Sequence, residues 1–406
     1  MRRFLKGVTR AGREEELENV SFLPTDAAHA VLLGRLDLGE GPTPVLVRDG
    51  RVIDVSGKAP TVSQLLNSGE DIAAVAGRDC GELSDFDLRF AWEGGDGRLL
   101  APIDLQCIKA AGVTFSNSAL ERVIEEAARG AKDSAAAIRS RLSQRIGGEI
   151  SQVRPGSEAA QRLKNELIKE GLWSQYLEVA IGPDAEVFTK APVLSAIGWG
   201  GDVGVRADSN WNNPEPEVVL VCDRTGRARG AMLGNDVNLR DIEGRSALLL
   251  GKAKDNNASC ALGPFIRLFD AHFTIDDVRR AKISLEIRGK DGFVLSEQSD
   301  MSRISRDPLE LAGQVLSPDH HYPDGFALFM GTMFAPVQDR GEAGAGFTHH
   351  QGDIVTISTP TLGALVNRVV HCHEAPPWRS GIADLMMNLS ARGLLSSQEP
   401  IASASQ

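Results

Sequence analysis

The chain has 406 residues, of which 42% are hydrophobic and 24% charged, and a formal net charge of −11. Length and composition are typical of a globular protein with about two to three domains, and the negative charge argues against a nucleic-acid-binding surface. No run approaches the ~18 apolar residues that span a bilayer, so we expect no membrane segment. The five cysteines form no CxxC pair, which favours reduced thiols in a cytoplasmic protein over disulfides or a structural zinc site.

Residues 1–26 combine both signs of charge and are expected to be a flexible lead, without the apolar core of a secretory signal. Residues 27–107 are predicted to form a small β-rich domain, because short apolar runs alternate there with Gly, Pro and Asp, which end strands. These runs are AVLLGRLDL, TPVLVRDG and RVIDVSG.

Residues 108–171 are predicted to hold a lid segment and a helical connector. Apolar residues recur there at three- and four-residue spacing over about 118–146, and the stretch VRPGS separates this pattern from a further helix expected over about 157–170. Residues 172–395 contain many short apolar runs and Gly-rich turns, which indicate a large mixed β domain with a few helices, and residues 396–406 read as a disordered tail. The predicted fold class is α+β, with a small N-terminal β-rich domain and a large C-terminal mixed β domain.

The pair Glu215 and Glu217 stands directly before an apolar run, 218–221. In a strand, side chains two residues apart point to the same face, about 6–7 Å apart along the chain. Two unpaired carboxylates near a core would raise each other's pKa and cost stability, whereas a hard divalent cation would bind both. Pro216 has no N–H to give to a sheet, so it marks a strand end or edge. Taken alone, the pair fits an exposed strand end better, since charged side chains are usually exposed.

Two charged residues downstream change this interpretation. If 218–222 and 227–233 pair as a hairpin around the turn DRTG, Asp236 returns close to the two glutamates. Its competing role is that of a capping aspartate before a helix expected over 239–251. Lys254 would balance negative charge, or act as a base if burial lowered its pKa; its competing role is to complement the dipole of that helix.

These motifs together resemble the fumarylacetoacetate hydrolase superfamily over about residues 108–395. The resemblance rests on the E-x-E pair before an apolar strand, on GNDVNLRD, on the lysine of AKDNNAS, and on FALFMGTMFAP followed by GDIVTISTPTLGALVNRV. Within the superfamily the chain is most similar to the branch of 2-keto-3-deoxy-D-pentonate dehydratases, through LWSQYLEVAIGPDAEVFTKAP and WNNPEPEVVLVCD, and this similarity extends into the N-terminal domain.

The resemblance implies roles for individual residues. It assigns the binding of a divalent metal, Mg²⁺ or Mn²⁺, to Glu215, Glu217 and Asp236, and catalysis to Lys254 and to Glu121 of the lid segment. The active site would then combine a carboxylate-bound cation with a lysine and the glutamate of the lid segment.

Further positions concern the substrate. Hydrolytic members carry a histidine three residues before the lid glutamate, where this chain has Ser118, so the pair that activates water for C–C bond hydrolysis is missing. Arg240 and Thr332 match positions that contact substrate, and Ser116 and Ser118 are candidates for hydrogen bonds to hydroxyl groups. Glu243 stands where several hydrolases have glutamine.

The resemblance therefore implies a divalent-metal-dependent dehydratase that converts 2-keto-3-deoxy-D-pentonate to 2,5-dioxopentanoate in non-phosphorylating pentose breakdown. Either Lys254 or Glu121 would remove the proton at C3, and the sequence does not choose between them. The alternatives are an acylpyruvase-type hydrolase, a 2-oxo acid decarboxylase and a non-catalytic 2-oxo acid binding protein. The expected partner is a small 2-oxo sugar acid, and the expected assembly is a homodimer or homotetramer.

Two weaker signals remain. Lys190 either faces the cleft or is a plain surface lysine. His371 and His373 share one strand face, and without an evident third ligand we interpret them as an exposed pair at a strand end.

Overall fold

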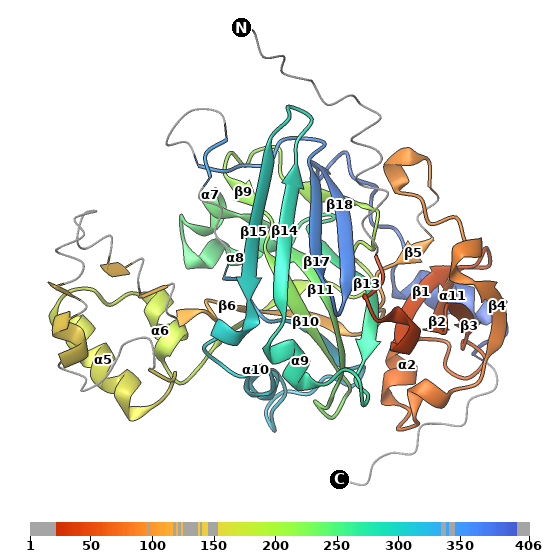
Figure 1. Ribbon diagram of the computed structural model, residues 1–406, viewed down its shortest axis with the longest axis horizontal. Coiled ribbons are helices and arrows are strands. Elements are labelled where there is room, and N and C mark those ends of the chain that lie inside the picture. The colour runs from red at the N-terminus through yellow and green to blue at the C-terminus, as the bar shows by residue number, and fades with distance from the viewer. Residues whose placement is uncertain are drawn as a thin grey trace, which may run out of the picture.

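The computed structural model describes residues 22–95, 98–116, 119–120, 123–124, 137–138, 140–144, 153–333, 338–340 and 346–395. Figure 1 shows a helical lobe, a central pair of sheets and the N-terminal strands arranged side by side. The described strands form sheets of eleven, five and two strands, which confirms the predicted α+β class. Most of the helical stretch expected over 118–146 and all of the expected tail lie outside the described residues. None of the described helices has the length and apolarity needed to cross a membrane.

The eleven-stranded sheet forms the centre of the molecule. Its order is β4-β3-β2-β1-β13-β11-β10-β16-β6-β7, with β5 paired to β1. The apolar run 218–221 becomes β10 because this strand lies between β11 and β16 and is buried along its whole length. The strands outside the N-terminal part are β6 Cys107–Gly112, β7 Glu186–Ala191, β10 Pro216–Cys222, β11 Ala228–Asp236, β13 Cys260–Leu268 and β16 Phe326–Phe329.

The five-stranded sheet packs on one face of this sheet. Its strands are β8 Asp202–Val205, β14 Lys282–Arg288, β15 Val294–Asp300, β17 Ile354–Thr359 and β18 Gly363–His371, in the order β15-β14-β17-β18-β8. Strand β14 alternates between exposed or half-buried and buried positions, so Ile283, Leu285 and Ile287 all point inward. They share a core with Val218 and Leu220 of β10. The core between the two sheets therefore holds β10 in place.

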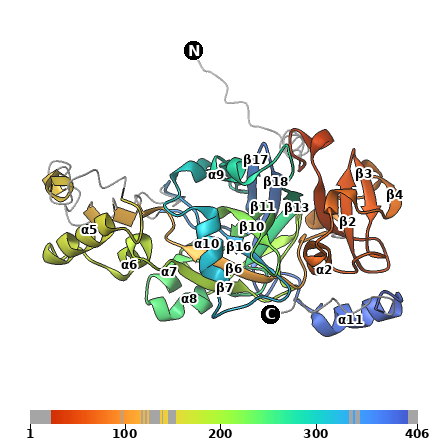
Figure 2. The same cartoon turned by 90° about the horizontal axis from the view of Figure 1, so that it is seen from below.

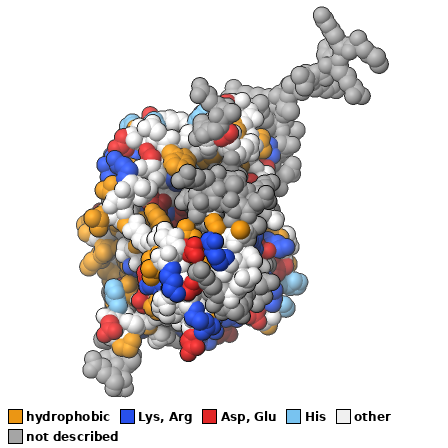
Figure 3. Space-filling model, turned by 90° about the vertical axis from the view of Figure 1, so that its left-hand side faces the viewer, with side chains coloured by type: hydrophobic (Ala, Val, Ile, Leu, Met, Phe, Trp, Pro, Cys, Tyr) orange, Lys and Arg blue, Asp and Glu red, His pale blue; other side chains and the backbone are white. Residues whose placement is uncertain are grey.

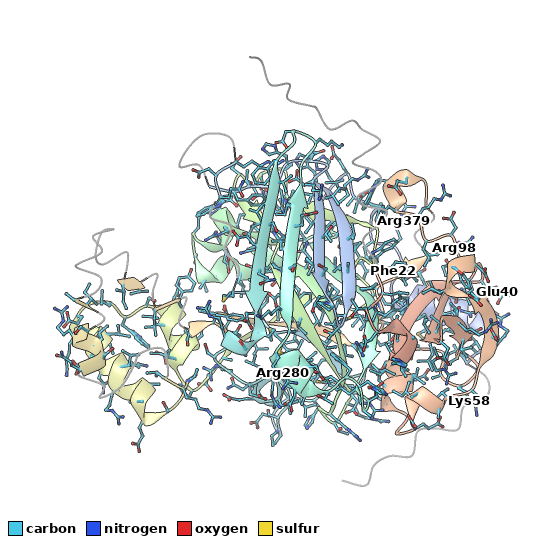
Figure 4. All side chains as sticks on the ribbon, in the orientation of Figure 1. Phe22, Glu40, Lys58, Arg98, Arg280 and Arg379 are labelled. Carbon is cyan, nitrogen blue, oxygen red and sulfur yellow. The ribbon has the colours of Figure 1, made fainter. Side chains whose placement is uncertain are left out.

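The N-terminal strands continue the central sheet. The three apolar runs of the N-terminal sequence form β1, β2 and β3 as predicted, and β1 pairs with β13 through Leu32–Arg267 and Leu33–Ile266. Figure 4 shows Phe22 at the junction, where its ring lies 5.1 Å from that of Trp199. The elements of this part are β1 Leu32–Asp37, β2 Pro42–Arg48, β3 Arg51–Asp54, α2 Val62–Asn67, β4 Arg78–Glu82 and β5 Leu99–Leu100.

Helices cover the ends and sides of the sheets (Figure 2). The helix expected over about 157–170 is confirmed as α5, whose first turn is capped by Ser157. C-terminal helix α11 lies beside the N-terminal strands, and its Asn388 donates to the carbonyl of Glu40 at 2.7 Å. Apart from α2 and the segment 239–254, the described helices are α5 Glu158–Lys169, α6 Gln175–Ile181, α9 Ile275–Arg279, α10 Pro308–Val315 and α11 Ile382–Ala391, with 3-10 turns at Ala27–His29, Ile72–Ala74, Leu83–Asp85, Ala91–Glu93 and Met301–Arg303.

The prediction of a single helix over 239–251 is wrong. The chain forms α7 Arg240–Glu243, a 3-10 turn Ala247–Leu249 and α8 Leu250–Lys254, preceded by the short strand β12 Asn238–Leu239, which pairs with β9 Asn212–Asn213. Gly244 ends α7, and Ser246 caps the next turn by accepting from the amide of Leu248. This break folds the segment back on itself, so that α8 lies beside α7 and β12.

A buried ion-pair network holds the segment that packs on β9. Asp353 is fully buried and accepts hydrogen bonds from Arg340 at 2.8 Å and from the amide of His350 at 2.9 Å, and its carboxylate lies 3.2 Å from the His349 ring. The His349 amide in turn donates to the side chain of Asn212 at 3.2 Å. The network therefore fixes β9, which lies directly before Pro214 and Glu215.

We expect Asp353→Asn to lower the free energy of unfolding by about 1.5–3 kcal/mol, because it leaves the buried guanidinium of Arg340 with only the more exposed Asp291 as its charge partner. Burial raises the pKa of Asp353, but hydrogen bonds from His349 and Arg340 outweigh it and hold that pKa at about 2. The unfolded value is about 3.9, so this stability is complete above that pH and is lost as the pH falls toward 2.

Chemical denaturation of the wild type and the variant between neutral and acidic pH tests this expectation. The difference in stability should shrink below about pH 4. The exposed Asp319→Asn is the matched control. A difference that stays constant down to the lowest pH would contradict the assignment.

Candidate active site

Hairpin β10–β11 brings the three predicted metal ligands together. Its register pairs Pro216 with Asn235 and Glu217 with Gly234, so Asp236 comes back beside Glu215. One carboxylate oxygen from each of Glu215, Glu217 and Asp236 lies within 4.8 Å of the others. Asp236 is the last residue of β11 and does not cap a helix, so its competing role is excluded. These three residues, called the trio below, lie where the hairpin leaves the core.

Two buried lysines contact the trio. Lys254 Nζ lies 2.5 Å from Glu215 Oε2 and 3.0 Å from Asp236 Oδ2, and Lys190 Nζ lies 2.8 Å from Asp236 Oδ1. Lys190 also donates to the carbonyls of Val237 and Lys254. Both lysines are buried, so the surface-lysine interpretation of Lys190 is wrong. Each carboxylate oxygen of Asp236 is thus paired with the ammonium group of one lysine.

The electrostatics of the trio leave negative charge uncompensated. Burial raises the pKa of Glu215 to about 7, although Lys254 opposes this, and burial together with Asp236 and Glu215 raises the pKa of Glu217 well above its usual value. Burial also raises the pKa of Asp236, but Lys190 and Lys254 outweigh it and hold that pKa below its usual value. The lysines therefore compensate Asp236 far better than Glu217.

Lys254 is stabilised in its charged form. Burial lowers its pKa, but the carboxylates of Asp236, Glu215 and Glu243 outweigh burial and raise the pKa well above its usual value. We expected that burial could lower the pKa of Lys254 and make it a neutral base. In the protein without a bound cation, the neighbouring carboxylates keep the lysine charged instead.

The donor set fits a divalent cation. All three groups are carboxylates, which are the ligands that Mg²⁺ and Mn²⁺ prefer. Glu217 is 2% exposed, and its charge receives a hydrogen bond from the amide of Gly331 at 2.6 Å. Gly331 has a φ of +86°, and a Cβ there would overlap the side chain of Thr114, so this amide depends on glycine. A cation at the trio would supply the positive charge that Glu217 lacks.

Two buried asparagines contact Glu215, and a third, Asn213, lies two residues before it. The side chain of Asn235 accepts from the Glu215 amide at 3.2 Å. Asn238 Nδ2 donates to Glu215 Oε1 at 2.9 Å and to Glu243 Oε2 at 2.7 Å. Within the described residues, Asn213 Oδ1, Asn235 Nδ2 and Asn238 Oδ1 are buried without a hydrogen-bond partner. Buried polar atoms are nearly always paired, so these groups are consistent with a site built to receive a polar ligand.

The other predicted residues fall into two groups. Ser116 is buried and its Oγ accepts from Ser305 at 2.7 Å, while the guanidinium of Arg240 lies 4.5 Å from the centre of the Trp211 ring. Thr332 directly follows Gly331, whose amide reaches Glu217. Ser118 and Glu121 lie outside the described residues, so their predicted roles stay predictions.

Strand β7 adds a carboxyl group that the sequence reasoning missed. Glu186, Phe188 and Lys190 follow one another at two-residue spacing, and the Phe188 ring lies 5.9 Å from Lys254 Nζ. A Cβ on Gly112 would overlap the Glu186 carboxylate. Burial raises the pKa of Glu186, and the charges of Glu243 and Asp236 add to this while Lys254 opposes it. The E-x-F-x-K spacing was the signal that could have found Glu186 and Lys190 together.

Two further features lie outside this site. His371 and His373 have a third possible metal ligand nearby, Glu374, and one ligand atom of each residue lies within 4.8 Å of the others. This group lies at the surface of the protein. A cavity of about 700 Å³ lies at the turn end of the β10–β11 hairpin, and the trio does not line it; its lining includes Thr225, Phe269, Ile275 and Leu309.

Comparison with known proteins places the chain in a family. The sequence profile of the fumarylacetoacetate (FAA) hydrolase C-terminal domain matches residues 174–370. A 2-dehydro-3-deoxy-D-arabinonate dehydratase of Saccharolobus solfataricus is 31% identical over 227 residues, which cover 55% of this chain and 69% of the relative. The chain belongs to the fumarylacetoacetate hydrolase family. Another relative, a probable 2-keto-3-deoxyxylonate dehydratase of Haloferax volcanii, is 30% identical over 194 residues, 48% of this chain and 63% of that relative.

Solved structures of the family show the same fold. A 2-keto-3-deoxyarabinonate dehydratase superposes with a TM-score of 0.58 at 22% identity, over 84% of this chain and 98% of the other. A 2-keto-3-deoxy-D-arabinonate dehydratase complexed with magnesium and 2,5-dioxopentanoate superposes with a TM-score of 0.57 at 21% identity, over 84% of this chain and 99% of the other.

On the described surface of the face in Figure 3, acidic and basic side chains are interspersed and form no patch of one sign.

We expect Glu217→Gln to weaken Mg²⁺ binding by at least about tenfold, because it removes one of three charged oxygen donors. The amide oxygen of glutamine can still accept from Gly331, so the fold should persist. Without metal, the melting temperature should not fall, since a buried charge has been removed. Calorimetric titration with Mg²⁺ measures the effect, and Glu297→Gln on the exposed side of β15 is the control. Unchanged affinity in Glu217→Gln would remove this residue from the ligand set.

Proposed function

We propose that this chain is a divalent-metal-dependent dehydratase, a hydro-lyase that converts 2-keto-3-deoxy-D-pentonate to 2,5-dioxopentanoate. The observation that carries the proposal is the trio of Glu215, Glu217 and Asp236 with Lys190 and Lys254 against it. Relatives at 31% and 30% identity are named as dehydratases of such sugar acids, which supports the substrate class. A cytoplasmic location and a homodimer or homotetramer complete the proposal.

The reaction removes water across C3 and C4 of the substrate. A base takes a proton from C3, the hydroxyl at C4 leaves with another proton as water, and the resulting unsaturated acid tautomerises to the aldehyde product. A divalent cation held by the trio would act as a Lewis acid on the 2-oxo group and make the C3 proton more acidic. The residues of the chain must then hold the substrate and supply a base and an acid.

Lys254 and Glu121 remain the candidate bases at C3. Lys254 is close to the cation ligands, where Glu215 and Asp236 stabilise its ammonium form. It can act as the base only after it has lost a proton, so the geometry of the protein alone favours Glu121. Arg240, Thr332, Ser116 and Ser118 are proposed to bind the substrate. Ser118 stands where hydrolytic relatives place a histidine, and this favours loss of water over C–C bond hydrolysis, since dehydration needs no activated water.

Glu186 is our candidate for the acid. Its side chain lies on the face of β7 that also carries Phe188 and Lys190, both of which contact Lys254 or its backbone. Burial raises the pKa of Glu186, which favours the protonated form that can donate to a leaving hydroxyl. In this proposal the Glu186 carboxyl donates its proton to the C4 hydroxyl as it leaves.

Purified protein with Mg²⁺ should release 2,5-dioxopentanoate from 2-keto-3-deoxy-D-xylonate or its L-arabinonate counterpart. Removal of the metal with a chelator should abolish the release, and added Mg²⁺ or Mn²⁺ should restore it. An aldehyde-specific coupled assay or mass spectrometry measures the product. Cleavage of an acylpyruvate with no action on either sugar acid would instead favour the hydrolase, and decarboxylation of a 2-oxo acid would favour the decarboxylase.

Glu186→Gln should lower kcat by about 10²–10⁴-fold, because glutamine keeps the shape of the side chain but cannot donate the carboxylic proton. KM should change much less, since the cation and the other binding groups remain. Steady-state kinetics over a range of pH test this, with Glu297→Gln as the control. Wild-type kcat in Glu186→Gln would exclude the acid role.

A further inference from the structure

A second cluster of possible metal ligands lies where β18 ends and the next turn begins. The imidazole rings of His371 and His373 lie side by side, with their centres 5.5 Å apart and their planes at 30°. The Glu374 carboxylate faces both rings, with Oε2 3.9 Å from His371 Nδ1 and Oε1 4.0 Å from His373 Nε2. Both distances exceed the length of a hydrogen bond. The three side chains, called the His–Glu cluster below, therefore face one another across a gap.

Backbone hydrogen bonds fix the turn that carries the His–Glu cluster. The amides of Glu374 and Ala375 both donate to the carbonyl of His371, at 2.9 and 3.0 Å. The amide of Cys372 donates to the carbonyl of Val205 in β8 at 2.8 Å. All three side chains of the cluster therefore leave the backbone from one hydrogen-bonded turn at the end of the five-stranded sheet.

The loop after α8 supports the same turn. Asn257 Nδ2 donates to the carbonyls of Cys372 and Pro376, at 2.9 and 3.3 Å. The Oδ1 of Asn257 accepts from the amide of Trp378 at 3.3 Å. The thiol of Cys372 lies on the side of β8, where a Cβ on Gly204 would come within 3.1 Å of its sulfur. The thiol is therefore not part of the His–Glu cluster.

The His–Glu cluster offers the donors that transition metals prefer. Two imidazoles and a carboxylate suit Zn²⁺ and Cu²⁺, whereas the all-carboxylate trio suits Mg²⁺. In the part of the chain that the structure describes, no lysine or arginine forms an ion pair with Glu374, which faces only the two imidazoles. Arg206, whose charge acts on Cys372, is paired with Asp208 at 2.7 Å. The negative charge of Glu374 is thus available to a cation.

The spacing within the cluster is close to the one that a single ion requires. Zinc–nitrogen and zinc–oxygen bonds of about 2.0–2.2 Å place two ligands of a tetrahedral ion roughly 3.4 Å apart, so the observed distances would shorten by about half an ångström. The side chains of His373 and Glu374 are 68% and 47% exposed, so small rotations of these side chains can close the gap. Gln351 Nε2 lies 2.5 Å from His371 Nδ1 and holds the other ring in place.

We propose that His371, His373 and Glu374 form a second metal site, which binds Zn²⁺ or a chemically similar transition-metal ion such as Cu²⁺ and completes its coordination with water. The ion would link the last residue of β18 to the turn through which the chain continues toward α11. An ion that binds this folded turn better than the unfolded chain stabilises the protein. The site is independent of the reaction proposed for the trio.

Electron paramagnetic resonance of bound Cu²⁺ tests the ligands. One equivalent of Cu²⁺ added to Mg²⁺-saturated protein should give a spectrum with nitrogen hyperfine coupling from imidazole, since the candidate ligands of the trio are all oxygens. His371→Ala and His373→Ala should each weaken Cu²⁺ binding at least about tenfold and reduce this coupling. His321→Ala removes an exposed histidine elsewhere and should behave like the wild type. A spectrum without nitrogen coupling, or equal spectra in all three variants, would overturn the proposal.

Zn²⁺ binding to Glu217→Gln separates this site from the trio. Because that variant lacks one ligand of the trio, Zn²⁺ bound at the His–Glu cluster should still be detected by calorimetric titration and should raise the melting temperature. Addition of the exposed substitution His373→Ala should weaken Zn²⁺ binding at least about tenfold and abolish the rise. Zn²⁺ affinity that His373→Ala leaves unchanged would contradict the site. Release of 2,5-dioxopentanoate is not part of either measurement, so the two proposals fail independently.

Discussion

The contact of the carboxylate trio of Glu215, Glu217 and Asp236, two of them buried, with two buried lysines is the interaction on which the site depends. Glu217 and Asp236 are each 2% exposed, and such burial is costly unless opposite charge lies close. Lys190 reaches Asp236 from β7 and Lys254 reaches it from α8, so two separate segments of the chain must dock correctly before the hairpin can keep its acids. The same arrangement leaves Glu217 to the amide of Gly331, which prepares the place of a cation.

The rest of the fold can be understood from this requirement. Strand β10 is buried on both faces, by the five-stranded sheet on one side and by the core that includes the N-terminal part on the other, so the hairpin has no freedom to move its acids apart. The broken helical segment after β11 carries Glu243 and Lys254 back to Glu215. The network around Asp353 holds β9, which leads directly into Glu215.

Local pattern explains what the sequence could predict. The turn DRTG between two apolar runs indicated the hairpin, and the hairpin register then placed Asp236 beside the glutamates. The helix over 239–251 was mistaken because apolar spacing outweighed Gly244 and Ser246, which interrupt it. Glu186 was missed and the role of Lys190 was left open, because burial of a charged strand residue depends on partners far along the chain, here Gly112 and Asp236, which the two-residue spacing of β7 indicates only in part.

The pairing of β1 with β13 has a consequence for how the molecule can be divided. Strand β13 is also the partner of β11, so the sheet that carries Asp236 continues without interruption into the N-terminal strands. Removal of those strands would leave the backbone groups at Arg267 and Ile266 unpaired along an apolar edge, and such edges recruit strands from other chains. The N-terminal part therefore covers an edge of the central sheet that would otherwise be open to pairing with another chain.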